Sequence, residues 1–150
     1  MAISRWRGQA REDSEMRPFR ELRVVQTAHT LVFAVYGETR TFPREELFGL
    51  TSQVRRSAAS IPTNIAEGSA RSDQEFHHFL RIALGSAAEL EYQLYLARDL
   101  GYIPSERYEL LNTDLMSVKG MLVQFMKRVR IDQPPRQRPM ANGQPPEAHA

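Results

Sequence analysis

The chain has 150 residues, of which 41% are hydrophobic and 25% charged, as is typical of one soluble globular domain. It contains no cysteine, so disulfides, thiolate metal sites and cysteine nucleophiles are excluded. The net charge of +2 is too small for a whole-molecule field that attracts nucleic acid. No apolar stretch approaches the roughly 20 residues that span a bilayer, so we expect a cytoplasmic protein.

The first 17 residues mix charges without helical periodicity and lack the continuous apolar run of a signal peptide. We interpret residues 1–17 as a flexible N-terminal arm. Pro18 suits the first turn of a helix, since proline needs no backbone N–H there. This helix is predicted to reach about Thr39, because apolar side chains recur at helical spacing. The stripe comprises Leu22, Val25, Ala28, Leu31, Val32 and Val35.

A second helix is predicted over residues 43–66. Proline suits its first turn, and the carboxylates of Glu45 and Glu46 favour the positive end of the helix dipole. Pro62 lies inside the helix, where it removes one backbone hydrogen bond and predicts a kink or local opening. Gly68 is predicted to end the helix in the left-handed conformation that glycine adopts readily.

Four polar side chains stack on the back face of this helix at about 100° per residue. They are Arg56, Ser60, Thr63 and Glu67. Ser60 and Thr63 are small, so another backbone is expected to approach closely there. Ser60 and Asn64 are also placed to bond the backbone groups that the internal proline frees.

A third helix is predicted from the capping box of Ser72 and Glu75 to Leu100, with Gly101 as its cap. Its core face comprises Phe76, Phe79, Leu80, Ala83, Ala87, Leu90 and Leu94. A second apolar stripe on nearly the opposite side comprises Ile82, Leu96 and Leu100, with Gly85 and Glu89 beside it. A helix that is apolar on two sides is buried on two sides, so this stripe predicts a neighbouring subunit.

An ionised glutamate in such a contact needs a cation. By residue type and facing direction, Arg56 is the best candidate partner for Glu89, across a helix or a subunit interface. The predicted subunit interface comprises Arg56, Ser60, Thr63, Ile82, Gly85, Glu89, Leu96 and Leu100.

A fourth helix is predicted from Pro104 and Ser105 to Arg130, because apolar residues repeat there at alternating spacings of three and four. The repeat comprises Tyr108, Leu111, Leu115, Val118, Leu122, Phe125 and Val129. Residues 132–150 are rich in proline and polar residues and are predicted to be disordered. Residues 18–131 are therefore expected to form one all-α domain, an antiparallel up-and-down four-helix bundle that assembles into a ring.

Residues 60–68, with the sequence SIPTNIAEG, follow QVRR at residues 53–56. Together they resemble the signature of a bacterial four-helix-bundle family encoded in intervening sequences of large-subunit ribosomal RNA genes. The match continues at residues 75–76, 85–86, 89–91 and 100–103, and covers roughly residues 20–129. The resemblance implies an antiparallel bundle that assembles as a ring, typically a pentamer, and implies no catalytic residues. The motif positions include Pro62, Asn64, Glu67, Gly68 and Ser86.

Metal and catalytic signals are weak. His77 and His78 point about 100° apart on a helix, so they do not easily bind one ion. A di-iron bundle needs two Glu-x-x-His motifs, and only Glu75 with His78 supplies one. No phosphate-binding loop, HExxH zinc motif or Gly-x-Ser-x-Gly turn is present. We expect no cofactor, no metal and no enzymatic activity.

Phosphate contacts require arginine or lysine side chains clustered on one surface. The candidates are Arg55, Arg71, Lys127, Arg128 and Arg130. A ring of identical subunits would repeat a small patch of these cations once in every subunit. The alternative is that cations near the end of the fourth helix only complement its dipole.

We predict a non-enzymatic homo-oligomeric interaction protein, with RNA or DNA as the candidate partner. One alternative is an accessory subunit of a reverse transcriptase of the diversity-generating retroelement type, whose relatives share the bundle but are more basic. The other is an enzyme or small-ligand module with a site between subunits. The polar cluster that could form it comprises Ser60, Asn64, Ser86 and Glu89.

Overall fold

The computed structural model describes residues 19–129, which form four α-helices and two short 3-10 helices and contain no strand. In chain order the elements are η1 (Phe19–Glu21), α2 (Arg23–Thr39), η2 (Arg44–Glu46), α3 (Leu50–Ser69), α4 (Asp73–Asp99) and α5 (Ser105–Arg128). The all-α prediction is confirmed over this range. The predicted arm and tail lie outside the described residues, as do Pro18 and Arg130.

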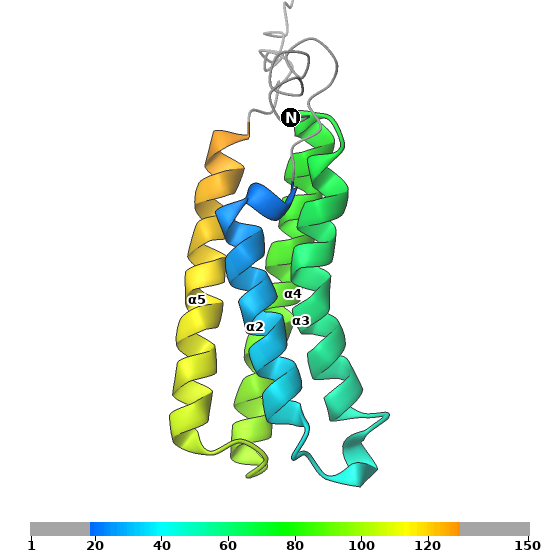
Figure 1. Ribbon diagram of the computed structural model, residues 1–150, viewed down its shortest axis with the longest axis vertical. Helices are drawn as coiled ribbons and strands as arrows, with labels where there is room; N and C mark the ends of the chain where they lie inside the picture. The colour runs from blue at the N-terminus through cyan, green and yellow to red at the C-terminus, as the bar shows by residue number, and fades with distance from the viewer. Residues whose placement is uncertain (1–18, 130–150) are drawn as a thin grey trace, which may run out of the picture.

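The four α-helices lie side by side along the long axis of the molecule, and consecutive helices connect at alternate ends (Figure 1). At one end of the bundle α2 begins, α3 connects to α4, and α5 ends. We call this end the upper end and the opposite end the lower end. Each helix packs against the next in the chain, and α5 closes the bundle against α2.

The core consists of the apolar stripes that the helical periodicity predicts. Its largest fully buried side chains are Leu31, Val35, Val54, Ile61, Ile65, Phe76, Leu80, Leu90, Leu94, Ile103, Leu115 and Leu122. The repeat on α5 is confirmed, since its residues from Tyr108 to Leu122 are buried and Phe125 packs edge-on against Phe76 with ring centroids 5.3 Å apart. Because every helix supplies part of this core, none of the four helices buries its apolar stripe alone.

Both ends of α4 form as local sequence signals predict. The Ser72 hydroxyl accepts from the Glu75 N–H while the Glu75 carboxylate accepts from the Ser72 N–H, which is a complete capping box. At the other end, Gly101 has a φ of +78°. Its N–H donates to Arg98 and the N–H of Tyr102 donates to Ala97, as in a Schellman cap.

The second helix begins later than the sequence analysis predicts. Residues 44–46 form the separate 3-10 helix η2, and α3 starts at Leu50. The acidic residues still act at a helix start, because the Glu46 carboxylate accepts from the N–H of Leu50 at 2.8 Å. Tyr102 donates to the same carboxylate at 3.5 Å. Burial, together with that carboxylate, raises the pKa of Tyr102 above its ordinary 10.0.

The prediction that Gly68 forms a left-handed cap is wrong. Gly68 is helical, α3 continues to Ser69, and Gly101 is the one glycine of residues 19–129 with a positive φ. Gly68 is instead a close-packing residue. A Cβ atom there would lie 2.6 Å from the Cβ of Phe79 and 2.8 Å from a ring carbon of Phe76. Only glycine therefore allows α4 to approach α3 this closely.

Helix α3 is also unbroken across Pro62, so the predicted local opening is not found. The side-chain bonds around the proline are local. Thr63 donates to the carbonyl of Ala59 at 2.7 Å, and Asn64 donates to the carbonyl of Ser60 at 2.8 Å. Neither bond reaches the carbonyl of Ala58, which is the group that the proline frees.

Candidate functional site

The polar residues of the family-like motif join α3 to α4. The hydroxyl oxygens of Ser60 and Ser86 are 2.8 Å apart and share a hydrogen bond. The Asn64 side-chain amide donates to the same Ser60 oxygen at 2.9 Å. Ser86 is buried, so this chain of three side chains lies within the α3–α4 contact. Ser60 thus faces α4 of its own chain, and its hydrogen bonds are used to hold the two helices together.

A shallow groove opens beside this bond. Its lining residues come from α3 and α4 and are Gln53, Arg56, Ser57, Ser60, Glu89 and Gln93. Arg56 and Glu89 lie on opposite walls and are exposed, and the structure records no ion pair between them. The side-chain oxygen of Gln93 is buried without a hydrogen-bond partner among the described residues. The two charges are thus placed on one surface and remain available to a partner outside the chain.

The predicted interface residues gather on this same surface, which we call the α3–α4 face. It carries the exposed residues Arg56, Thr63, Ile82, Gly85, Glu89 and Leu100. Leu96 and Ser60 are exceptions. Leu96 is half-buried and packs against the chain's own core, and Ser60 is half-buried and bonded to Ser86 of its own chain. The apolar stripe predicted on α4 is therefore reduced to Ile82 and Leu100, which are 39% and 50% exposed.

Gly85 has no packing role within the chain, since a Cβ atom there would meet nothing within 4 Å. Glycine in an exposed helix position costs about 1 kcal/mol relative to alanine. Gly68 differs from Gly85 in this respect, because side chains of α4 pack directly against Gly68. Open space over Gly85 is what a close approach from another molecule needs.

Two of the predicted phosphate-binding arginines make contacts within the chain. Arg55 is half-buried, and its Nε donates to the hydroxyl of Thr39 at 2.8 Å. Its guanidinium also lies 4.9 Å from the ring centroid of Tyr36. Arg55 therefore ties α3 to α2, which is a structural role.

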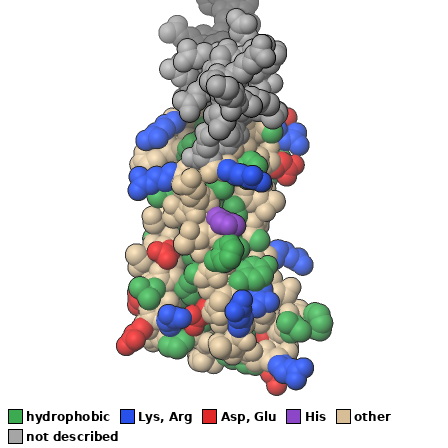
Figure 2. Space-filling model, in the orientation of Figure 1, with side chains coloured by type: hydrophobic (Ala, Val, Ile, Leu, Met, Phe, Trp, Pro, Cys, Tyr) green, Lys and Arg blue, Asp and Glu red, His purple; other side chains and the backbone are tan. Residues whose placement is uncertain are grey.

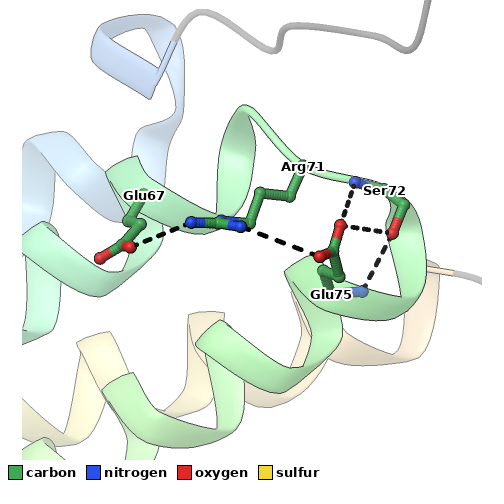
Figure 3. Close-up of polar contacts among 4 residues, drawn as sticks. All are labelled: Glu67, Arg71, Ser72 and Glu75. Carbon is green, nitrogen blue, oxygen red and sulfur yellow. Dashed lines mark hydrogen bonds and ion pairs between the residues drawn. The ribbon is translucent and has the colours of Figure 1, made fainter.

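Arg71 is neutralised at the link between α3 and α4 (Figure 3). Its guanidinium forms ion pairs with Glu67 at 3.3 Å and with Glu75 at 3.8 Å. It also lies 5.2 Å from the ring centroid of Phe79. Two carboxylates beside one guanidinium leave no net positive charge for a phosphate, so Arg71 is a weaker candidate than its sequence context indicates.

The remaining cations lie at the upper end. Lys127 and Arg128 are exposed in the last turn of α5 and form no ion pair with another residue of the described range. Arg20 and Arg23 are exposed on η1 and at the start of α2. Figure 2 shows Lys and Arg side chains around this end of the molecule. We call Arg20, Arg23, Lys127 and Arg128 the cationic end.

Sequence reasoning missed Arg20 and Arg23 because they are distant from Lys127 in the chain. Their nearness follows from the bundle connectivity, in which α2 begins at the end where α5 finishes (Figure 1). An electrostatic role within the chain also fits Lys127 and Arg128, which lie at the negative end of the α5 dipole. No such role exists for Arg20 and Arg23, which lie at the start of a helix.

Residues 19–129 show neither a cluster of metal ligands nor a membrane-spanning helix. No group of three or more His, Cys, Asp or Glu side chains there could hold a metal ion. His78 is exposed and its ring packs against Phe79 at 5.8 Å, while His77 is half-buried. None of the described helices is long and apolar enough to cross a bilayer.

Comparison with known proteins places this arrangement in a family. A family model described as 23S rRNA-intervening sequence protein matches residues 20–124. A crystal structure of a protein of unknown function, from the S23 ribosomal protein family of Bacteroides thetaiotaomicron, is 30% identical with a TM-score of 0.65. The alignment covers 69% of this chain and 98% of that one. No curated protein matches the chain.

Proposed function

Because the chain belongs to the 23S rRNA-intervening sequence protein family, we propose that it is a non-enzymatic subunit of a homo-oligomeric ring that binds RNA or DNA. Each subunit is an antiparallel four-helix bundle. The family resemblance implies five subunits. The proposal has two parts, the assembly and the nucleic-acid contact, and different residues support each.

The cationic end carries the nucleic-acid part of the proposal. Lys127 and Arg128 are exposed and unpaired among the described residues, and they share the upper end with Arg20 and Arg23. Phosphate groups are bound by such clustered, solvent-accessible cations, and each contact releases counterions. A ring repeats the cluster once per subunit, so a patch that is weak in one chain becomes multivalent.

The α3–α4 face supports the assembly part. Ile82 exposes apolar surface beside Gly85, over which nothing packs in the chain, and Leu100 exposes more at the C-terminal end of the same helix. Exposed apolar surface that no part of the chain covers is typical of an interaction site. Glu89 and Arg56 lie at the border of this surface without pairing, as charges do when their partners belong to another molecule.

The test is binding of the full chain to labelled single-stranded RNA and to duplex DNA, measured by fluorescence anisotropy over a range of salt concentrations. The double variant Lys127→Ala/Arg128→Ala should bind more weakly. On duplex DNA, the slope of log affinity against log salt should flatten by about 0.9 for each lost phosphate contact.

The matched control is Arg40→Ala/Arg107→Ala, which removes the same charge from exposed residues at the lower end. This control should bind like the unaltered protein. Equal weakening by both double variants would mean that only total charge matters and would remove the cationic end as a site. No detectable binding at low salt would retire the nucleic-acid part of the proposal.

A further inference from the structure

Four large apolar side chains are exposed together on the side of the bundle formed by α2 and the start of α3. They are Phe33, Tyr36, Leu47 and Phe48, which we call the aromatic surface. Phe48 is 93% exposed and Phe33 is 68% exposed. Tyr36, Leu47 and Phe48 line one groove with Thr51, Ser52, Arg55 and Arg56. Figure 2 shows hydrophobic side chains gathered on the face of the molecule where α2 runs.

The segment that carries Phe48 is held in place by hydrogen bonds. The N–H of Leu47 donates to Arg44, and the N–H of Gly49 donates to Glu46. The Glu46 carboxylate in turn accepts from the N–H of Leu50 and from the Tyr102 hydroxyl. Phe48 is therefore presented to solvent by an ordered link, although burial of a phenyl ring is strongly favourable.

We propose that the aromatic surface binds the α3–α4 face of a second copy of this chain, with Phe33 and Phe48 packing on Ile82, Gly85 and Leu100. The inference rests on the proposed ring and names its two contacting surfaces. A head-to-tail ring requires two different surfaces on every subunit. The predicted interface residues that are exposed all lie on one of them, the α3–α4 face, so the second must lie elsewhere.

Shape favours this pairing. The aromatic surface protrudes, since Phe48 is nearly fully exposed. The α4 surface is open at Gly85, where a Cβ atom would meet nothing within 4 Å. A protruding ring over a glycine gives the close packing that buried interface cores have.

Charge favours it as well. Arg44 is exposed four residues before Phe48 and forms no ion pair with a described residue. Glu89 is exposed one helical turn from Gly85 and forms no ion pair with a described residue. Opposite unpaired charges at the two borders match in a head-to-tail contact, and arginine and aromatic residues are enriched where interfaces are energetically strongest.

The rival occupant is single-stranded nucleic acid, whose bases stack on exposed aromatic rings beside arginine. Arg55 already covers one of these rings, Tyr36, and Leu47 offers no stacking plane. The observations therefore favour a protein partner.

The experiment uses three variants of the full chain at exposed positions, so the bundle itself is preserved. Phe48→Glu disables the aromatic surface, and Ile82→Glu disables the α3–α4 face. Leu110→Glu, on α5 and outside both surfaces, is the matched control. Molar mass is measured by light scattering, and helicity by circular dichroism confirms that each variant is folded.

We expect Phe48→Glu and Ile82→Glu each to reduce the oligomer to single chains of 17.2 kDa, while Leu110→Glu keeps the mass of the unaltered protein. A mixture of the two disrupted variants should form a two-chain species of about 34 kDa, twice the mass of one chain. Each chain retains one intact surface, so only one contact can form between them.

Four results would overturn the inference. An oligomer that survives Phe48→Glu would exclude the aromatic surface while leaving the ring itself in place. A mixture that stays at 17.2 kDa would mean that the two surfaces do not bind each other. Unchanged mass together with weaker binding of a polyuridine probe by Phe48→Glu would assign the surface to base stacking. If the unaltered protein is itself a single chain, the ring fails and this inference fails with it.

Discussion

Ser60 and Ser86 share a hydrogen bond of 2.8 Å that joins the middle of α3 to α4. A hydroxyl pair inside a helix contact replaces apolar packing with a bond of defined length and direction. Asn64 orients Ser60 from the next turn of α3. The motif therefore sets how the two helices lie against each other, and so positions the residues of the α3–α4 face.

Loss of the Ser60–Ser86 hydrogen bond should lower the free energy of unfolding, and the effects of substituting the two serines should not be additive. Ser60→Ala and Ser86→Ala are each expected to lower the free energy of unfolding by about 1 kcal/mol. The double variant should cost less than the two single costs added together, because one bond is removed in each case. Urea unfolding of all four proteins gives the coupling energy. Strict additivity would show that the two hydroxyls do not interact.

Gly68→Ala should destabilise the bundle by about 1–3 kcal/mol, since the added methyl group overlaps Phe79 and Phe76. The control is Gly120→Ala on α5, where a Cβ atom would meet nothing within 4 Å. That substitution should stabilise the helix by up to about 1 kcal/mol. Thermal unfolding of the two variants should therefore shift in opposite directions. A shift of Gly68→Ala in the stabilising direction would contradict the close packing of α3 on α4.

The capping box and the ion pairs in Figure 3 should differ in how much they contribute to the free energy of unfolding. Ser72→Ala removes the capping box at the start of α4 and should cost about 1 kcal/mol. Glu67→Gln removes one of two carboxylates beside Arg71, in a pair whose side chains are about half exposed. Such exposed pairs contribute less than about 1 kcal/mol and are screened by salt. Denaturation at low and high salt should therefore change the cost of Glu67→Gln but not that of Ser72→Ala.

Tyr102 should make stability fall at high pH. Its pKa is raised above 10.0 in the folded chain by burial and by Glu46, so the unfolded chain releases this proton first. The stabilisation is complete below the unfolded pKa near 10 and is lost as pH rises through the folded pKa. Ultraviolet titration should show one of the five tyrosines ionising late. Tyr102→Phe should remove that late step. A titration in which the substitution removes an early or ordinary step would contradict the assignment.

The sequence predicts what depends on local chemistry and misses what depends on contact between helices. The α4 capping box, the Gly101 cap and the repeat on α5 are local patterns, and all three form as predicted. Gly68 has the sequence signal of a cap, but its position against Phe79 is a tertiary fact. Tertiary packing therefore overrides the local preference of glycine for helix ends.

The residues of the candidate site likewise fall into those that the sequence predicts and those that depend on contacts between helices. Residue type and helical spacing identify Ile82, Gly85 and Glu89, because they share one side of α4. The same reasoning cannot show that Leu96 turns into the core or that Arg71 lies between two carboxylates. The aromatic surface is missed because Phe33 and Phe48 come from different elements, and neither belongs to a helical stripe.

The central claim is that this bundle functions as a closed ring of identical chains. The most direct measurement is the molar mass of the unaltered full chain by light scattering at micromolar concentration. A pentamer predicts about 86 kDa, five times the mass of one chain. A mass of 17.2 kDa would contradict the claim, because Ile82, Leu100 and Phe48 would then have no partner to bury them.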